Sequence, residues 1–226
     1  AKRFGSEIVN YNIDKVDFTT SPFMVWAGDK LYQSHSIIIS TGASAKLLGL
    51  ESEKKLMGYG VSACATCDAF FFKEKKVFVV GGGDSAMEEA MFLTKFASSV
   101  TIIHRKDSFR ASKIMQDKTR NNDKIDVMWN ATVVDMIGDP GDGGLKSIDI
   151  KNVHTGEISN ISCDGLFLGI GHTPNSKMFV NQLDLDKSGY IITKERSSKT
   201  SIDGVFAAGD IMDPTYRQAV TAAGTG

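Results

Sequence analysis

Cysteine is scarce in this sequence, with only three among 226 residues. Two of the three, Cys64 and Cys67, lie close together, so the chain has no disulfide framework of the kind that holds small secreted proteins. Positive and negative charges are nearly balanced, since the sequence has 26 lysines and arginines and 27 aspartates and glutamates. A formal net charge of -1 gives no electrostatic reason to expect nucleic acid or an anionic membrane as a partner.

Long apolar runs are also missing. The runs at 36–39 and 69–72 are far too short to cross a bilayer, and no charged-then-apolar leader opens the sequence. We therefore expect a cytoplasmic protein without a membrane span. The sequence begins with Ala1 in place of methionine and stops at Gly226, so we expect a fragment or a natural truncation.

The first third of the sequence reads as short strands. Runs at 8–13, 23–27 and 30–33 are separated by turn residues and predict an antiparallel meander. An apolar, β-branched run at 36–40 predicts a buried strand that meets a tight turn.

After Leu47 the pattern changes to alternating strands and helices. A strand over 76–80, a helix over 84–96 and a strand over 100–104 predict a βαβ unit with parallel strands and a right-handed crossover. A second helix is expected over 113–120. The class is therefore α/β.

The last part mixes a hairpin with further strands. Strands over 127–136 and 145–153 are joined by a Gly/Asp/Pro cluster that predicts a flexible hairpin loop. Two more strands are expected over 164–169 and 205–208, and a final helix over 216–223.

A glycine-rich turn joins the strand over 76–80 to the following helix. Gly81 allows the tight turn, and Gly83 lets the backbone approach a pyrophosphate. A small third residue lets helix and strand pack closely, and the helix N-terminus offers unpaired N–H groups to phosphates. The candidate dinucleotide-binding residues are Gly81, Gly83, Asp84, Ser85 and Ala86. The alternative is a glycine-rich turn without a ligand.

The end of the next strand indicates which nucleotide is bound. An NAD site places an acidic residue there for the ribose hydroxyls, whereas this strand ends in a basic cluster. Arginine binds a phosphate bidentately, so the cluster favours the 2′-phosphate of NADPH. The candidate residues are His104, Arg105, Lys106 and Arg110. The alternative is a solvated basic turn.

Cys64 and Cys67 have the Cys-x-x-Cys spacing of a reducible disulfide, which exchanges through thiolate attack. Asp68, beside the second cysteine, is placed to move a proton as the pair opens. A zinc site needs two further ligands and only Cys163 is left, so we predict no metal and a buried structural thiol at Cys163. Together with the glycine turn, the pair predicts an NADPH-linked disulfide reductase.

These motifs resemble, in order and spacing, those of the low-molecular-weight thioredoxin reductases, which are pyridine nucleotide-disulfide oxidoreductases. The resemblance covers essentially the whole chain and is carried by residues 60–68, 81–90, 104–111, 169–175, 205–210 and 216–219.

The resemblance implies a three-layer, Rossmann-like FAD/NAD(P)-binding fold, in which an NADPH domain over 45–174 is inserted in an FAD domain over 1–44 and 175–226. We expect the FAD domain to be incomplete. The family begins with its own strand–Gly-x-Gly-x-x-Gly–helix unit, which grips the FAD pyrophosphate and has no counterpart here.

The resemblance also implies a mechanism. NADPH reduces FAD by hydride transfer, FAD reduces the Cys64–Cys67 disulfide through Cys67, and Cys64 exchanges with thioredoxin. Asp68 would be the general acid, and Asp210 would bind the ribityl or ribose part of FAD. The N-terminal end of the last helix would face the flavin through Arg217, Gln218 and Ala219.

The family resemblance further implies hinges at 41–43 and 171–174 and a homodimer. Two other functions stay open. One is an NADPH-binding module without electron transfer. The other is a sister flavoprotein, either one that serves a peroxidase or a small-molecule dithiol oxidase. The basic cluster argues against an oxidase, because an oxidase has no need of NADPH.

Overall fold

The computed structural model describes residues 2–195 and 197–226, so Ala1, at the start of the first expected domain, lies outside the described residues. Their contacts form two compact units, one over 45–172 and one over 2–44 with 173–226. Where the chain passes between the units, β5 (Ala43–Ala45) pairs with β14 (His172–Pro174). Within the described ranges, no helix is both long and apolar enough to cross a membrane.

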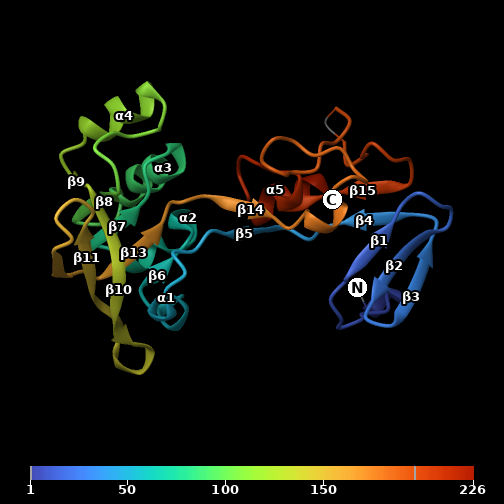
Figure 1. Cartoon of the computed structure of the whole chain (residues 1–226), viewed down its shortest axis with the longest axis horizontal. Coiled ribbons are helices and arrows are strands. Elements are labelled where there is room, and N and C mark those ends of the chain that lie inside the picture. The colour runs from blue at the N-terminus through green and yellow to red at the C-terminus, as the bar shows by residue number, and fades with distance from the viewer. Residues whose placement is uncertain (1, 196) are drawn as a thin grey trace. The chain divides into compact units, whose positions relative to one another are not determined.

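The unit over 45–172 is built on a five-stranded parallel sheet with the order β6-β13-β7-β8-β9 (Figure 1). Its strands are β6 (Val61–Ser62), β13 (Gly165–Leu168), β7 (Lys76–Val80), β8 (Ser99–His104) and β9 (Ile125–Trp129). The predicted βαβ unit is confirmed, because β7 and β8 pair in parallel on either side of α3 (Asp84–Leu93) in the sequence. The helix predicted over 84–96 ends at Leu93, three residues earlier than expected, and residues 94–96 form a turn.

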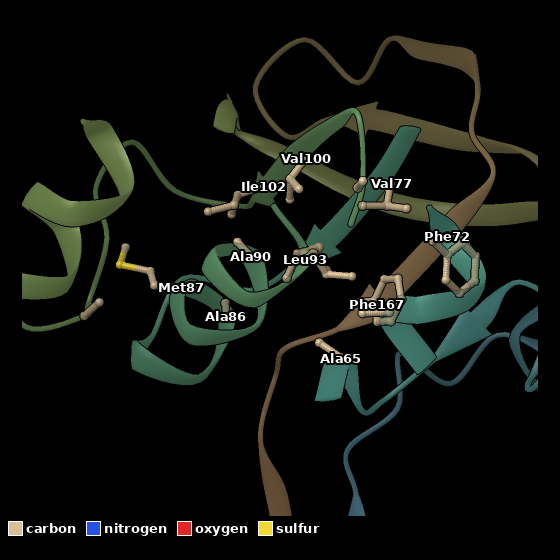
Figure 2. Packing of buried hydrophobic residues seen from close by; sticks show 14 of the residues in the cluster. Ala65, Phe72, Val77, Ala86, Met87, Ala90, Leu93, Val100, Ile102 and Phe167 are labelled. Atoms are coloured by element: carbon tan, nitrogen blue, oxygen red, sulfur yellow. The ribbon is translucent and has the colours of Figure 1, made fainter. Parts of the chain in front are cut away.

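Helices cover one face of this sheet. Successive side chains of β7 point to opposite faces, so Val77 and Val79 pack against α3. Figure 2 shows Leu93 of α3 directed toward these strands. Complete burial of a leucine side chain stabilises the fold by roughly 1.5–3 kcal/mol. The other α-helices of this unit are α1 (Glu51–Leu56), α2 (Ala65–Asp68) and α4 (Lys113–Arg120), and the short helix η2 (Ala69–Phe72) follows α2.

An antiparallel sheet covers the other face. Phe78 and Val80 of β7 belong to a second buried cluster, which includes Val133 and Ile148 of this smaller sheet. Its strands are β10 (Ala131–Asp139), β11 (Gly144–Asn152) and β12 (Ile158–Ser162), with η3 (Pro140–Asp142) in the predicted hairpin loop. The three layers predicted for the fold are therefore present.

The strand predicted over 127–136 is wrong as one element. It is two strands, β9 and β10, which belong to different sheets and are separated by Asn130. Asn130 has a φ of 53°, and asparagine tolerates this left-handed conformation better than most residues. The left-handed residue Asn130 therefore separates two consecutive strands that belong to different layers.

The unit over 2–44 and 173–226 has its own core, in which Phe18, Phe23 and Phe179 pack together. Its antiparallel meander consists of β1 (Lys15–Asp17), β2 (Phe23–Ala27) and β3 (Lys30–Ser34). A parallel pair consists of β4 (Ile37–Ile39) and β15 (Val205–Ala207). The remaining segments are η1 (Lys2–Phe4), η4 (Lys177–Phe179), η5 (Gly209–Ile211) and α5 (Ala219–Thr225).

Three predictions for this unit are corrected. The strand predicted as buried over 36–40 is only partly buried, since Ile39 is buried but Ile38 is 70% exposed. Residues 8–13 are not a strand: Lys15–Asp17 takes the place beside β2, which buries Val16, while Ile8 and Tyr11 are exposed. The last helix begins at Ala219, because the preceding residues fold into a turn around the Asp213 side chain.

Candidate functional site

The candidate residues of the 45–172 unit gather at one edge of its parallel sheet. The carboxyl ends of parallel strands lie at the same edge, where open α/β sheets bind ligands. There β6 leads to Cys64, β7 to Gly81, β8 to Arg105 and β13 to Gly169. Since neighbouring strands are about 4.8 Å apart, the ends of β6 and β7, on either side of β13, are about 10 Å apart across the sheet.

The redox pair is a disulfide in this structure, with the Cα atoms of Cys64 and Cys67 5.3 Å apart. Cys64 is half-buried at the N-cap of α2, and Cys67 is exposed. The N–H groups of Cys67 and Asp68 each donate to the Cys64 carbonyl oxygen at 3.2 Å, which closes the turn. The disulfide is therefore held rigidly and is open to solvent, as exchange with a second protein requires.

Asp68 is linked to the redox turn through a serine. Its Oδ2 accepts a hydrogen bond from the Ser62 hydroxyl at 2.6 Å, and the Ser62 Oγ accepts one from the Cys64 N–H at 3.0 Å. Asp68 also lines a cleft of about 340 Å³ with Tyr59 and Phe71. The Asp68 carboxyl is therefore linked by hydrogen bonds to the redox turn and also opens to a cleft that neither cysteine lines.

The glycine turn lines a second cleft, of about 460 Å³, which is a usual size for a small-molecule site. Six of the residues predicted for the nucleotide line it: Gly81, Gly83, Ser85, His104, Arg105 and Arg110. Three others, Asp84, Ala86 and Lys106, are not among the lining residues. Arg105 and Arg110 are exposed, so the cleft is basic at the end of β8.

The geometry of the turn agrees with the reasons given for its small residues. Gly81 has a φ of 153°, and a Cβ on it would lie 2.5 Å from the Gly169 carbonyl oxygen and 2.6 Å from the Ala86 Cβ. Ala86 is completely buried, so its role is helix–strand packing. Gly83 has no atom within 4 Å of the position of a Cβ, which leaves open space for a ligand.

His104 lies under the turn, where it is 5% exposed. Its Nε2 is 3.0 Å from the Ser108 carbonyl oxygen, and a Cβ on Gly82 would overlap its ring. Burial lowers the pKa of His104 below its ordinary value of 6.5, and the charge of Arg110 acts in the same direction. At neutral pH the ring is therefore uncharged, and it supports the turn and the loop after it.

The structure adds lining residues that the sequence did not indicate: Leu47, Leu48, Ala131, Thr132 and Ile170. Leu48 is held by Glu53, a completely buried carboxylate that accepts the N–H groups of Leu48 and Gly49 at 2.8 and 2.9 Å. A glutamate in the first turn of α1, just after the glycine-containing run 47–50, was the available signal.

Cys163 is buried, as predicted, with its side chain in the cluster beneath the smaller sheet. Burial, and then the charge of Asp164, raises the pKa of its thiol to about 12. The thiolate form is the reactive one, so Cys163 is inert at neutral pH. Among residues 2–195 and 197–226, no group of three or more His, Cys, Asp or Glu side chains could hold a metal ion.

In the other unit the predicted flavin residues follow β15. Asp210 is half-buried just after that strand, and no hydrogen bond of its carboxylate to another described residue is found. The guanidinium of Arg217 donates to the Pro214 carbonyl oxygen and contacts the Tyr190 hydroxyl. Gln218 is the N-cap of α5 and forms a capping box with Thr221, and Ala219 is the first helical residue.

Asp213 is a residue of this region that the sequence reasoning missed. Its carboxylate accepts the N–H groups of Thr215, Tyr216 and Arg217 at 2.8–2.9 Å and the Thr221 hydroxyl at 3.2 Å. Burial acts to raise the pKa of Asp213, but these hydrogen bonds outweigh it and hold the pKa below the ordinary value of 3.8. An aspartate directly before a proline was the available signal for this turn.

We expect Asp213→Ala to destabilise the 173–226 segment by about 1 kcal/mol at neutral pH, the usual cost of a lost side-chain cap. Because the folded pKa is lowered, the carboxylate contributes its stability above pH 3.8 and loses it as the pH falls through the folded pKa. The difference between wild type and variant should therefore shrink below pH 3.8. Urea unfolding followed by the fluorescence of Trp26 measures it, and a pH-independent difference would contradict the assignment.

Comparison with known proteins agrees with this geometry. A family model for pyridine nucleotide-disulphide oxidoreductases matches residues 2–226. The chain is 53% identical over 227 residues to a thioredoxin reductase from Rickettsia conorii. The aligned region covers 100% of this chain and 73% of that protein.

Solved structures agree with the sequence relatives. A thioredoxin reductase from Streptococcus pyogenes has a TM-score of 0.91 at 38% identity, over 99% of this chain and 72% of that one. One from Giardia duodenalis has a TM-score of 0.90 at 38% identity, over 99% and 73% of the two chains. The chain belongs to the pyridine nucleotide-disulphide oxidoreductases and, within that family, to the thioredoxin reductases.

Proposed function

We propose that this chain is an NADPH-dependent thioredoxin reductase, in which the Cys64–Cys67 pair passes two electrons to the disulfide of thioredoxin. The observation that carries the proposal is the placement of a solvent-open disulfide and a basic, glycine-lined cleft on the carboxyl edge of one parallel sheet. The disulfide, which can hold two electrons, and the cleft proposed for the two-electron donor therefore lie at the same edge of one sheet.

The cleft fits NADPH on three counts. Open space above Gly83 admits a pyrophosphate close to the backbone. The first N–H groups of α3 and its positive dipole end favour phosphate. Arg105 and Arg110 at the end of β8 supply bidentate donors for a 2′-phosphate, and we assign Lys106, on the same exposed loop, to longer-range attraction.

The described residues of the other unit fit part of FAD. The half-buried Asp210 carboxylate, which has no hydrogen-bond partner among them, suits a ribityl or ribose hydroxyl. We assign Arg217, Gln218 and Ala219, at the N-terminus of α5, to the flavin ring. When bound, FAD supplies the two-electron carrier that links a hydride donor to a disulfide.

The chain's own sulfur chemistry then completes the reaction. We assign Cys67 to receive the electron pair and Cys64 to attack one sulfur of thioredoxin, which forms a mixed disulfide and releases the other thioredoxin sulfur. Attack of Cys67 on the mixed disulfide re-forms the Cys64–Cys67 bond and frees reduced thioredoxin. Asp68, hydrogen-bonded through Ser62 to the turn, supplies the proton that the leaving sulfur takes up.

The test uses the whole chain with added FAD, NADPH and oxidised thioredoxin, and counts the free thiols formed on thioredoxin. We expect reduction that requires both NADPH and FAD, and a flavin absorbance that NADPH bleaches. NADPH binding without reduction of any disulfide would overturn the proposal in favour of a nucleotide-binding module. Faster reduction of a peroxiredoxin than of thioredoxin would overturn the choice of partner.

We also propose that the chain acts as a homodimer, on the strength of the family resemblance. Light scattering coupled to size exclusion measures the mass directly, and a mass equal to that of one chain, 24.5 kDa, would contradict this.

A further inference from the structure

The basic residues of the nucleotide cleft lie on one segment, which we call the basic loop and define as residues 105–111. The loop is held at several points. The Ser108 carbonyl oxygen lies 3.0 Å from Nε2 of His104, and the Lys106 carbonyl oxygen accepts the Asn130 N–H at 3.3 Å. The Gly82 carbonyl oxygen accepts the N–H groups of Arg110 and Ala111 at 2.8 and 3.2 Å. Phe109 is buried against Trp129, with ring centroids 4.3 Å apart. A further attachment lies just beyond the loop, at Ser112.

Ser112 is held by Asp84. A single carboxylate oxygen, Oδ1 of Asp84, accepts both the Ser112 N–H at 2.9 Å and the Ser112 hydroxyl at 2.8 Å. Ser112 is also the N-cap of α4, so the bond ties the start of α3 to the start of α4 across 28 residues of sequence.

The presence of Asp84 needs a reason. It stands in the first turn of α3, where its negative charge stabilises the helix but repels an incoming phosphate. It is not among the residues that line the cleft. Direct contact with the nucleotide, the role expected from the sequence, therefore explains it poorly. The bonds to Ser112 explain it better.

We propose that Asp84 is a positioning residue that sets the preference for a 2′-phosphorylated nucleotide by holding the basic loop through Ser112. The proposal rests on the proposed NADPH function. Arg105, Lys106 and Arg110 are exposed, and a loop that lacked the attachment at Ser112 would be less well ordered before a phosphate binds. Holding the loop in advance lowers the cost of ordering it only for ligands that reach it.

The test is calorimetric titration of the whole chain with adenosine 2′,5′-bisphosphate and with 5′-AMP, which lacks the 2′-phosphate. We expect Asp84→Ala to weaken the bisphosphate by about tenfold, the effect of losing one to two hydrogen bonds. Its effect on 5′-AMP should stay within about twofold. The ratio of the two affinities is the readout, because general destabilisation changes both affinities together.

Three further variants sharpen the result. Asp84→Asn keeps the acceptor oxygen and should restore the wild-type ratio. Ser112→Ala loses only the hydroxyl bond and should shift the ratio by about two- to threefold, so it serves if Asp84→Ala folds poorly. Asp149→Ala is the matched control, since Asp149 accepts one hydrogen bond from Asn160 and is not among the residues that line the cleft.

The outcomes separate this inference from the function on which it rests. Equal losses for both ligands in Asp84→Ala, or an unchanged ratio in Asp84→Ala and Ser112→Ala, would overturn the positioning role. If wild type itself does not prefer the bisphosphate, or Arg110→Ala leaves the preference intact, the NADPH assignment fails instead.

Discussion

Replacing either Cys64 or Cys67 with serine is expected to reduce the rate of NADPH-dependent thioredoxin reduction to that measured without protein. A serine hydroxyl cannot form the sulfur–sulfur bond that stores two electrons. The remaining thiol, Cys163, cannot replace it, because it is buried and has a pKa of about 12. The measurement is the number of thiols formed on thioredoxin with NADPH and FAD present.

Two controls make this result specific. Cys163→Ala removes a thiol that plays no part in exchange, so its turnover should match wild type. The Cys64→Ser, Cys67→Ser double variant should still bind adenosine 2′,5′-bisphosphate normally, because neither sulfur lines the nucleotide cleft. A double variant as active as its parent would remove the disulfide from the mechanism altogether.

The second large effect is expected at the glycine turn, where Gly81 and Gly83 should respond differently to the same substitution. A Cβ at position 81 meets a carbonyl oxygen at 2.5 Å on a backbone with φ of 153°. Both strain and overlap act there, so Gly81→Ala should destabilise the 45–172 unit by about 2–4 kcal/mol.

Gly83→Ala provides the matched comparison. Position 83 has ordinary negative φ and no atom near the added methyl group, so stability should stay within about 0.5 kcal/mol of wild type. The methyl group would instead occupy the space of a pyrophosphate, and NADPH affinity should fall by about tenfold or more. Urea unfolding can be followed at Trp129, which belongs to this unit, in a Trp26→Phe background. Equal stability of the two variants would contradict the packing argument.

Much of the fold follows from short stretches of sequence. The central strand β7 and the start of α3 lie where periodicity and the glycine turn predicted them. These elements have one dominant signal each, since a buried parallel strand is apolar throughout and a glycine turn needs no partner to adopt its shape. In residues 127–136, by contrast, the strand pattern continues across Asn130 and conceals the turn there.

The candidate site divides in the same way. Neighbouring residues and their chemistry were enough to identify the Cys64–Cys67 pair, Asp68 beside it and the basic end of β8. Contacts between residues distant in sequence gave Asp84 its bonds to Ser112, placed His104 uncharged beneath Gly82, and gave Glu53 and Asp213 their backbone partners. These reactive groups can be recognised from the sequence because each motif consists of particular side chains that are close together along the chain. Their burial, charge state and partners arise only when separate segments pack together, since each depends on groups that the neighbouring sequence does not contain.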